Sequence, residues 1–272
     1  MPLNVQLLII DPQNDFCDPD KGTLYVKGAE HDMDRVSDMI RQKKKKFDDV
    51  HITLDSHHLL DCGNPLYWKD TSGNHPDPFT IISVADVESH KWTTSAPGFY
   101  KRALQYVKDL EVSNRYPLCV WPPHCLIGSP GHAIWPNLFD ALCEWETDCL
   151  GVVDKVTKGS NPHTEHYSAI KAEVPDDDDV FSQINTKLIE ALLEADSLVI
   201  CGEAGSHCVA NTVRDIATAF KNDDLLKKIT LLTDAMSPVE HPQELFKQWQ
   251  DDFINEMTSR GMQTSTTTEF LS

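Results

Sequence analysis

The fold is decided by one stretch of the chain, Ser197-Leu-Val-Ile-Cys-Gly-Glu-Ala-Gly-Ser-His-Cys208-Val-Ala-Asn-Thr-Val-Arg-Asp-Ile-Ala217. Its apolar start, at 198–201, is typical of a buried strand, and the small residues at 202–205 favour a tight turn. Apolar residues then recur at helical spacing through 206–220. The stretch therefore predicts a strand, a tight turn and a helix, which is the repeating unit of α/β folds.

Cys208 falls in the first turn of this predicted helix. There the free backbone N–H groups and the positive end of the helix dipole favour a thiolate. A thiol whose pKa is lowered in this way becomes a nucleophile. The alternative is a small core residue, since free cysteines are commonly buried. The stretch alone leaves both interpretations open.

The rest of the chain alternates in the same way. Strand patterns occur at 5–10, 50–54, 151–156, 198–201 and 229–232, and helical patterns at 32–46, 97–110, 137–145, 182–194, 206–220 and 243–257. Strands separated by helices indicate a mostly parallel sheet with helices on both faces. We therefore expect an α/β fold of the Rossmann-like, doubly wound kind.

The segment at about 59–116 interrupts this alternation, because it is long, polar and rich in Pro, Gly, His and Trp. We expect a single domain over 1–272, with this segment as an insertion that covers part of it. Its role is left open between a lid, a subunit contact and both together.

The composition excludes several classes of partner. A net charge of -19 argues against nucleic acid and against anionic lipid, since both would repel the protein. No apolar run approaches the roughly 20 residues of a membrane span, and the first strand is preceded by no signal-peptide pattern. The eight cysteines include no Cys-x-x-Cys pair, which favours a reducing, cytoplasmic setting.

Reactive side chains follow four of the predicted strands. Asp11 follows the first strand, Asp55 the second, Lys158 the third, and the turn that carries Cys208 the fourth. Ligands of open parallel sheets bind outside the carboxyl ends of the strands. Each residue alone could be a helix cap or a solvated loop residue, but four at one edge predict a functional site.

These groups suit nucleophilic catalysis by a thiol. A carboxylate can take the thiol proton, and a nearby lysine favours the thiolate. The N–H groups around 203–204 and at the helix start can form an oxyanion hole. Asp55 and His57 offer an oxygen and a nitrogen to a divalent metal, and His124 is a candidate third ligand. The alternative for Asp55 and His57 is a surface turn after a strand.

Five motifs follow one another along the chain. They are Asp11-Pro-Gln-Asn-Asp-Phe16, Asp55-Ser-His57, Trp121-Pro-Pro-His124-Cys-Leu-Ile-Gly-Ser-Pro-Gly131, Lys158-Gly159 and Gly202-Glu-Ala-Gly-Ser-His-Cys208-Val. In this order they resemble the isochorismatase-like cysteine hydrolases, and within them are most similar to the nicotinamidases. The resemblance covers about residues 5 to 240 and implies a six-stranded sheet and a homo-oligomer.

The resemblance implies a catalytic triad of Asp11, Lys158 and Cys208. It places a cis peptide bond between Glu203 and Ala204, and an oxyanion hole at the N–H groups of Ala204 and Cys208. The activity implied is hydrolysis of a linear amide C–N bond through a thioester on Cys208. The expected substrate is nicotinamide, which would give nicotinate and ammonia. This reaction belongs to pyridine nucleotide biosynthesis.

The resemblance further implies a metal held by Asp55, His57 and His124, with Zn expected and Fe or Mn as alternatives. Phe16 resembles the aromatic wall of the family's substrate pocket. The long insertion also contains His75 and His90, and either of these could replace His124 as the third ligand.

The chain departs from the family's usual residues at two motifs. Ser56 stands where tryptophan is usual, and 203–207 differ from the usual turn, which leaves the substrate open. Two alternatives to a nicotinamidase therefore stay open. One is a metal-independent hydrolase of another small amide or a vinyl ether, and the other is a non-catalytic binding or redox-sensing protein.

Overall fold

A computed structural model of the protein describes residues 3–113, 115–240 and 245–271. Its centre is a six-stranded sheet of parallel neighbours in the order β10-β9-β8-β1-β2-β7. The strands are β1 (Val5–Ile10), β2 (Asp49–Asp55), β7 (Asp154–Lys158), β8 (Ser197–Gly202), β9 (Ile229–Leu232) and β10 (Gln263–Ser265). The predicted α/β fold with a doubly wound sheet is therefore confirmed.

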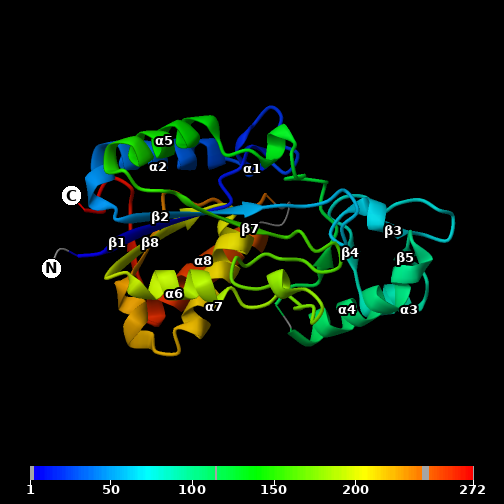
Figure 1. Ribbon diagram of the computed structural model, residues 1–272. Coiled ribbons are helices and arrows are strands. Elements are labelled where there is room, and N and C mark those ends of the chain that lie inside the picture. The colour runs from blue at the N-terminus through cyan, green and yellow to red at the C-terminus, as the bar shows by residue number, and fades with distance from the viewer. Residues whose placement is uncertain (1–2, 114, 241–244, 272) are drawn as a thin grey trace.

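Helices cover both faces of the sheet, as Figure 1 shows. One face carries α1 (Asn14–Cys17), α2 (Ala29–Lys43) and α5 (Pro136–Cys149), and the other carries α6 (Thr186–Glu194), α7 (Ala210–Ala219) and α8 (Leu245–Ser259). Every residue of β1 is buried, because this central strand has a neighbour on each side and helices on both faces. Among the described residues, no helix is both long and apolar enough to cross a membrane.

Several predicted boundaries are wrong. The strand predicted at 151–156 begins at Asp154, so Lys158 is the last residue of β7 rather than a residue after it. The apolar Val152 and Val153 precede the paired segment and shifted the prediction. The helix predicted at 206–220 begins as a π-helical turn, Gly205–Val209, before α7. Of the helix predicted at 243–257, Gln243 and Glu244 lie outside the described residues.

The remaining predicted helices lie close to their expected places. The pattern at 32–46 corresponds to α2 and a 3-10 turn, Lys44–Lys46. The pattern at 182–194 corresponds to α6, preceded by a 3-10 turn, Val180–Ser182. The short polar β10 was not recognised as a separate strand, because three residues, Gln263–Ser265, carry no apolar pattern.

The described part of 59–116, here called the lobe, lies beyond the carboxyl end of β2 (Figure 1). The lobe contains β3 (Trp68–Lys69), β4 (Ile81–Ile82), α3 (Val84–Glu88), β5 (Thr93–Thr94) and α4 (Tyr100–Ser113), and β4 pairs with β6 (Leu118–Cys119). It has a buried cluster of its own, separate from the core around the sheet, that includes Tyr67, Trp68, Ile82 and Val107. At its base, the N–H of His57 donates to the carbonyl of Cys125 at 3.1 Å, and the N–H of Ile127 donates to the carbonyl of His57 at 3.1 Å.

Candidate active site

The carboxyl ends of the strands bring Asp11, Lys158 and Cys208 together. The Nζ atom of Lys158 lies 2.9 Å from Oδ2 of Asp11 and 3.7 Å from Sγ of Cys208. All three residues are buried. Lys158 also donates to the carbonyl of His166 at 3.0 Å, which fixes its side chain over the strand ends. The structure thus assembles a carboxylate, an amino group and a thiol from the segment after β1, the end of β7 and the turn after β8.

Thr53 orients Asp11. Its hydroxyl donates to Oδ1 of Asp11 at 2.6 Å, and the N–H of Asp11 donates to the carbonyl of Thr53 at 3.1 Å. The first bond occupies Oδ1 and leaves Oδ2 directed at Lys158. Sequence reasoning missed Thr53, although a polar residue inside the apolar run of β2 was a signal.

Burial dominates the protonation of the thiol and the acid. It raises the pKa of Cys208 well above the usual range, and the charge of Lys158 opposes it only in part. The expectation of a lowered thiol pKa is therefore wrong, because loss of solvent outweighs the helix start and the lysine. Burial also raises the pKa of Asp11, against the effect of Lys158. The resting pair is thus a neutral thiol beside a carboxylate that is more basic than an ordinary aspartate.

The turn before Cys208 has the expected unusual backbone. The peptide bond between Glu203 and Ala204 is cis, as the resemblance implied. Gly202 has a φ of 122°, and a Cβ there would lie 2.1 Å from the carbonyl oxygen of Ile10, so only glycine fits. The turn leads into the π-helical segment Gly205–Val209, which carries Cys208. Ala204 and Cys208, the residues expected to form the oxyanion hole, both line one cavity.

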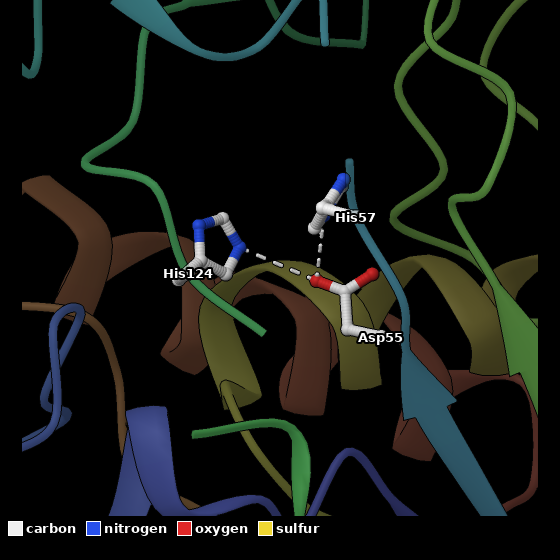
Figure 2. A group of neighbouring side chains, drawn as sticks. All are labelled: Asp55, His57 and His124. Atoms are coloured by element: carbon white, nitrogen blue, oxygen red, sulfur yellow. Dashed lines mark hydrogen bonds and ion pairs between the residues drawn. The ribbon is translucent and has the colours of Figure 1, made fainter. Parts of the chain in front are cut away.

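Asp55, His57 and His124 form a buried group beside the triad. Figure 2 shows the two imidazoles directed at the same carboxylate oxygen, with Oδ2 of Asp55 lying 3.0 Å from Nε2 of His57 and 3.3 Å from Nε2 of His124. Their ligand atoms lie within 4.8 Å of one another. The other candidate histidines are elsewhere, because His75 and His90 are exposed in the lobe. Only His124 of the three candidates stands next to Asp55.

The outer nitrogens of both histidines have partners that fix the rings. Nδ1 of His57 donates to Oδ2 of Asp61 at 3.1 Å, and Nδ1 of His124 donates to the carbonyl of Pro122 at 2.9 Å. Histidines that bind metals usually have such partners, because these hold the other nitrogen toward the ion. Sequence reasoning missed Asp61, whose signal was its position four residues after His57.

The charges in this group suit a cation. Burial acts to raise the pKa of Asp55, but His57 and Lys158 outweigh it and hold that pKa well below the usual range. Burial acts to lower the pKa of His57, but the carboxylates of Asp55 and Asp61 outweigh it and raise that pKa. The same carboxylates would favour a divalent ion in place of the proton on Nε2. The donor set of one carboxylate and two imidazoles therefore fits a metal such as zinc.

A pocket opens over the thiol and the Asp55 group. Its walls are largely aromatic and include Phe16, Trp121, Tyr167 and His207. The ring of Phe16 lies 5.4 Å from that of His124, which places it at the wall expected from the sequence. Burial lowers the pKa of His207 to about 3, so this ring is neutral near pH 7. The sequence alone did not single out Trp121, Tyr167 or His207 as wall residues.

No protein-family model matches the chain, and no curated protein matches its sequence. Solved structures do match. The Acinetobacter baumanii nicotinamidase/pyrazinamidase matches with a TM-score of 0.62 and 21% identity over 100% of both chains. Yeast nicotinamidase Pnc1p bound to the inhibitor nicotinaldehyde matches with a TM-score of 0.63 and 18% identity, over 96% of this chain and 99% of that one. The Pyrococcus horikoshii pyrazinamidase in complex with zinc matches with a TM-score of 0.57 and 19% identity, over 97% of this chain and 99% of that one. The chain therefore has the fold of the nicotinamidase and pyrazinamidase structures.

Proposed function

We propose that the protein is a metal-dependent cysteine amidohydrolase that converts nicotinamide to nicotinate and ammonia. The observation that carries the proposal is the placement of Lys158 between Asp11, Cys208 and Asp55, below one cavity. The shared fold supports it, since the similar structures are named nicotinamidases and pyrazinamidases.

The reaction begins with Asp11 taking the proton of Cys208 as Sγ attacks the amide carbonyl carbon. A C–S bond forms, and the N–H groups of Ala204 and Cys208 stabilise the oxyanion. The C–N bond then breaks as Asp11 returns its proton to the leaving ammonia, which leaves a thioester on Cys208. Asp11 next takes a proton from water, whose oxygen attacks the thioester. The C–S bond breaks and Asp11 returns its proton to the sulfur. The carboxylic acid releases its own proton to water and leaves as nicotinate.

Lys158 stabilises charge throughout this sequence. Its ammonium is 3.7 Å from the sulfur, so it favours the thiolate as the proton leaves. It is also 2.9 Å from Asp11, and this bond holds the carboxylate in place for each proton transfer. Burial acts to lower the pKa of Lys158, but Asp11 and Asp55 outweigh it and raise that pKa, so the side chain stays charged.

Asp55, His57 and His124 would hold the divalent metal, for which zinc is our first choice and iron or manganese the alternatives. A bound ion would supply Lewis-acid attraction for a ring nitrogen or a water oxygen. The chain's own contribution is a dry, preformed ligand set, because Asp61 and Pro122 already hold both imidazoles.

The shape of the cavity favours a flat substrate. Phe16, Trp121 and Tyr167 offer ring surfaces, and the indole N–H of Trp121 donates to the hydroxyl of Tyr167 at 3.1 Å, which fixes that wall. A pyridine ring between such walls gains contact area without ordering flexible groups. An aliphatic amide lacks this contact and should be a poorer substrate.

The test is ammonia release from nicotinamide, pyrazinamide and isobutyramide, with and without a chelator. The proposal expects turnover of the two ring amides that is lost on chelation, restored by zinc, and absent in Cys208→Ala. Turnover that persists in chelator would favour the metal-independent hydrolase instead. No turnover of any amide, with metal bound, would favour a non-catalytic protein. The homo-oligomeric state, the cytoplasmic setting and the single domain over 1–272 stay predictions from the sequence.

A further inference from the structure

Ser237 is bonded to both neighbours of Ala204. The N–H of Ser237 donates to Oε2 of Glu203 at 3.1 Å, and its carbonyl accepts from the N–H of Gly205 at 2.8 Å. Ala204 is thus flanked by two bonds to one residue from outside the turn. Only Ala204 lines the cavity, and its partners Glu203, Gly205 and Ser237 do not.

Ser237 is itself fixed by helix α2. Its hydroxyl donates to Oδ2 of Asp32 at 2.6 Å, and Asp32 forms an ion pair with Arg35 one turn later on the same helix. Arg35 also donates to the carbonyl of Asp234 at 2.6 Å. Asp234 precedes Ser237 by three residues in the chain. A chain of hydrogen bonds therefore runs from α2 through Ser237 to the turn.

Glu203 is an unusual residue to bury at this place. It is fully buried, and Oε1 meets no donor among the described residues. Burial first, and then the carboxylate of Asp32, raise the pKa of Glu203 well above the usual range. A raised pKa favours the protonated form of Glu203, which is the form that can donate a proton to the carboxylate of Asp32. Its backbone N–H donates to the carbonyl of Ile10 at 2.8 Å, which joins the turn to the strand before Asp11.

We propose that Asp32, Ser237 and Glu203, here called the positioning group, hold the N–H of Ala204 where the oxyanion of the reaction forms. This inference rests on the proposed function. None of the three lines the cavity, so they act through Ala204 and are positioning residues. An oxyanion donor contributes about 10²- to 10³-fold to kcat, and a displacement of about 1 Å forfeits much of such a contribution.

Steady-state kinetics on nicotinamide test the inference with two variants. Ser237→Ala and Glu203→Val should lower kcat by about 10- to 100-fold and change KM by less than about threefold, because the oxyanion exists only in the transition state. Ser37→Ala is the matched control, since Ser37 is a buried serine of α2 whose hydroxyl donates only to the carbonyl of Met33. It should keep the wild-type kcat.

Glu203→Gln separates positioning from a merely structural role. A glutamine amide can accept from Ser237 and donate to Asp32, so this variant should keep kcat within about threefold of the wild type. If Glu203→Gln lowers kcat as much as Glu203→Val does, the shared proton is not what holds the turn, and the inference fails. If Glu203→Val keeps the wild-type kcat, the inference also fails.

Hydrogen exchange of residues 202–208, followed by mass spectrometry, gives a readout that needs no activity. Exchange should be faster in Ser237→Ala and Glu203→Val, and unchanged in Glu203→Gln and Ser37→Ala. A wild-type protein that hydrolyses no carboxamide would refute the proposed function, whereas unchanged exchange in the first two variants would refute the positioning group. Should Glu203→Val not fold, the Ser237→Ala variant decides the matter alone.

Discussion

The ammonium group of Lys158 lies 3.0 Å from Oδ1 of Asp55. The lysine that serves the thiol is therefore bonded directly to the residue that would bind the metal. Its side chain is only 1% exposed, and it is also bonded to Asp11. One cation is thus shared by two buried carboxylates, and the two halves of the site depend on each other through it.

Replacing Lys158 by methionine should destabilise the fold. The change leaves Asp11 and Asp55 buried without their shared cation, and removing one partner from a buried pair costs about 3–5 kcal/mol. Urea unfolding at pH 7 measures the loss. Lys155→Met is the control, since Lys155 lies on the same strand with its side chain 44% exposed and should change stability by less than about 0.5 kcal/mol. Equal stability of the two variants would contradict the prediction.

Replacing Cys208 by serine should abolish turnover. A hydroxyl at this position is far less nucleophilic than a thiolate, so we expect a loss of at least about 10³-fold in kcat for nicotinamide. Ammonia release measures the rate, and mass spectrometry of the quenched enzyme should find the acyl adduct only on the wild type. Cys143→Ser, at an exposed cysteine of α5, should behave as the wild type.

Replacing Asp61 by asparagine should weaken metal binding without removing a ligand. Asp61 accepts from Nδ1 of His57 and so holds the ring and raises its basicity as a ligand. Loss of such an outer partner typically lowers metal affinity by about 10- to 100-fold. Competition against a chromophoric chelator measures the affinity. Asp77→Asn, at an exposed aspartate of the lobe, should leave it unchanged.

The stabilising contribution of Glu173 should be lost as the pH rises from about 5 to 8. Burial, opposed in part by Arg115, raises the pKa of Glu173 to about 7 in the folded protein, against an ordinary value of 4.5. Between these two pKa values the folded chain holds a proton that the unfolded chain releases. The stabilisation that comes from this proton is therefore fully present below pH 4.5 and is lost as the pH rises through 7. We expect Glu173 to lower the free energy of unfolding by about 1–3 kcal/mol over this range of pH.

Urea unfolding at half-unit steps of pH tests this prediction. Burial likewise raises the pKa of Glu165 to about 8, so it adds a loss of the same sign at slightly higher pH. Glu173→Gln cannot ionise, so the free energy of unfolding of the wild type should fall relative to that of this variant as the pH rises through 7. A variant with the same slope would show that Glu173 does not titrate in this range.

The sequence predicted the convergence of Asp11, Lys158 and Cys208 because a parallel sheet brings successive strand ends to one edge. That inference needs only the order of strands and helices, and tolerates an error of a few residues in a boundary. The start of β7 was misplaced by three residues, yet Lys158 still stands at the correct end of the sheet. Local pattern is sufficient for such placement because the carboxyl ends of all the strands face the same way.

The protonation of the thiol could not be predicted from local pattern. Helix position favours a thiolate, but burial depends on everything packed over Cys208, including the aromatic walls from distant segments. Thr53 and Asp61 were missed for a related reason. Each acts through a hydrogen bond to one side chain, Asp11 or His57, and a sequence pattern does not show such a bond. The choice of His124 over His75 and His90 depended on the path of the lobe, which no periodicity describes.

The bonds between His57, Cys125 and Ile127 at the base of the lobe have a consequence for how this protein can vary. The chain leaves the sheet and returns to it at one point, where the backbone is already joined. The two histidines beside Asp55 are therefore set by this junction and not by the number of residues between them. Within the lobe, Asp61 must keep its bond to Nδ1 of His57, whereas exposed residues far from this junction, such as Asp77, can change without moving the two histidines.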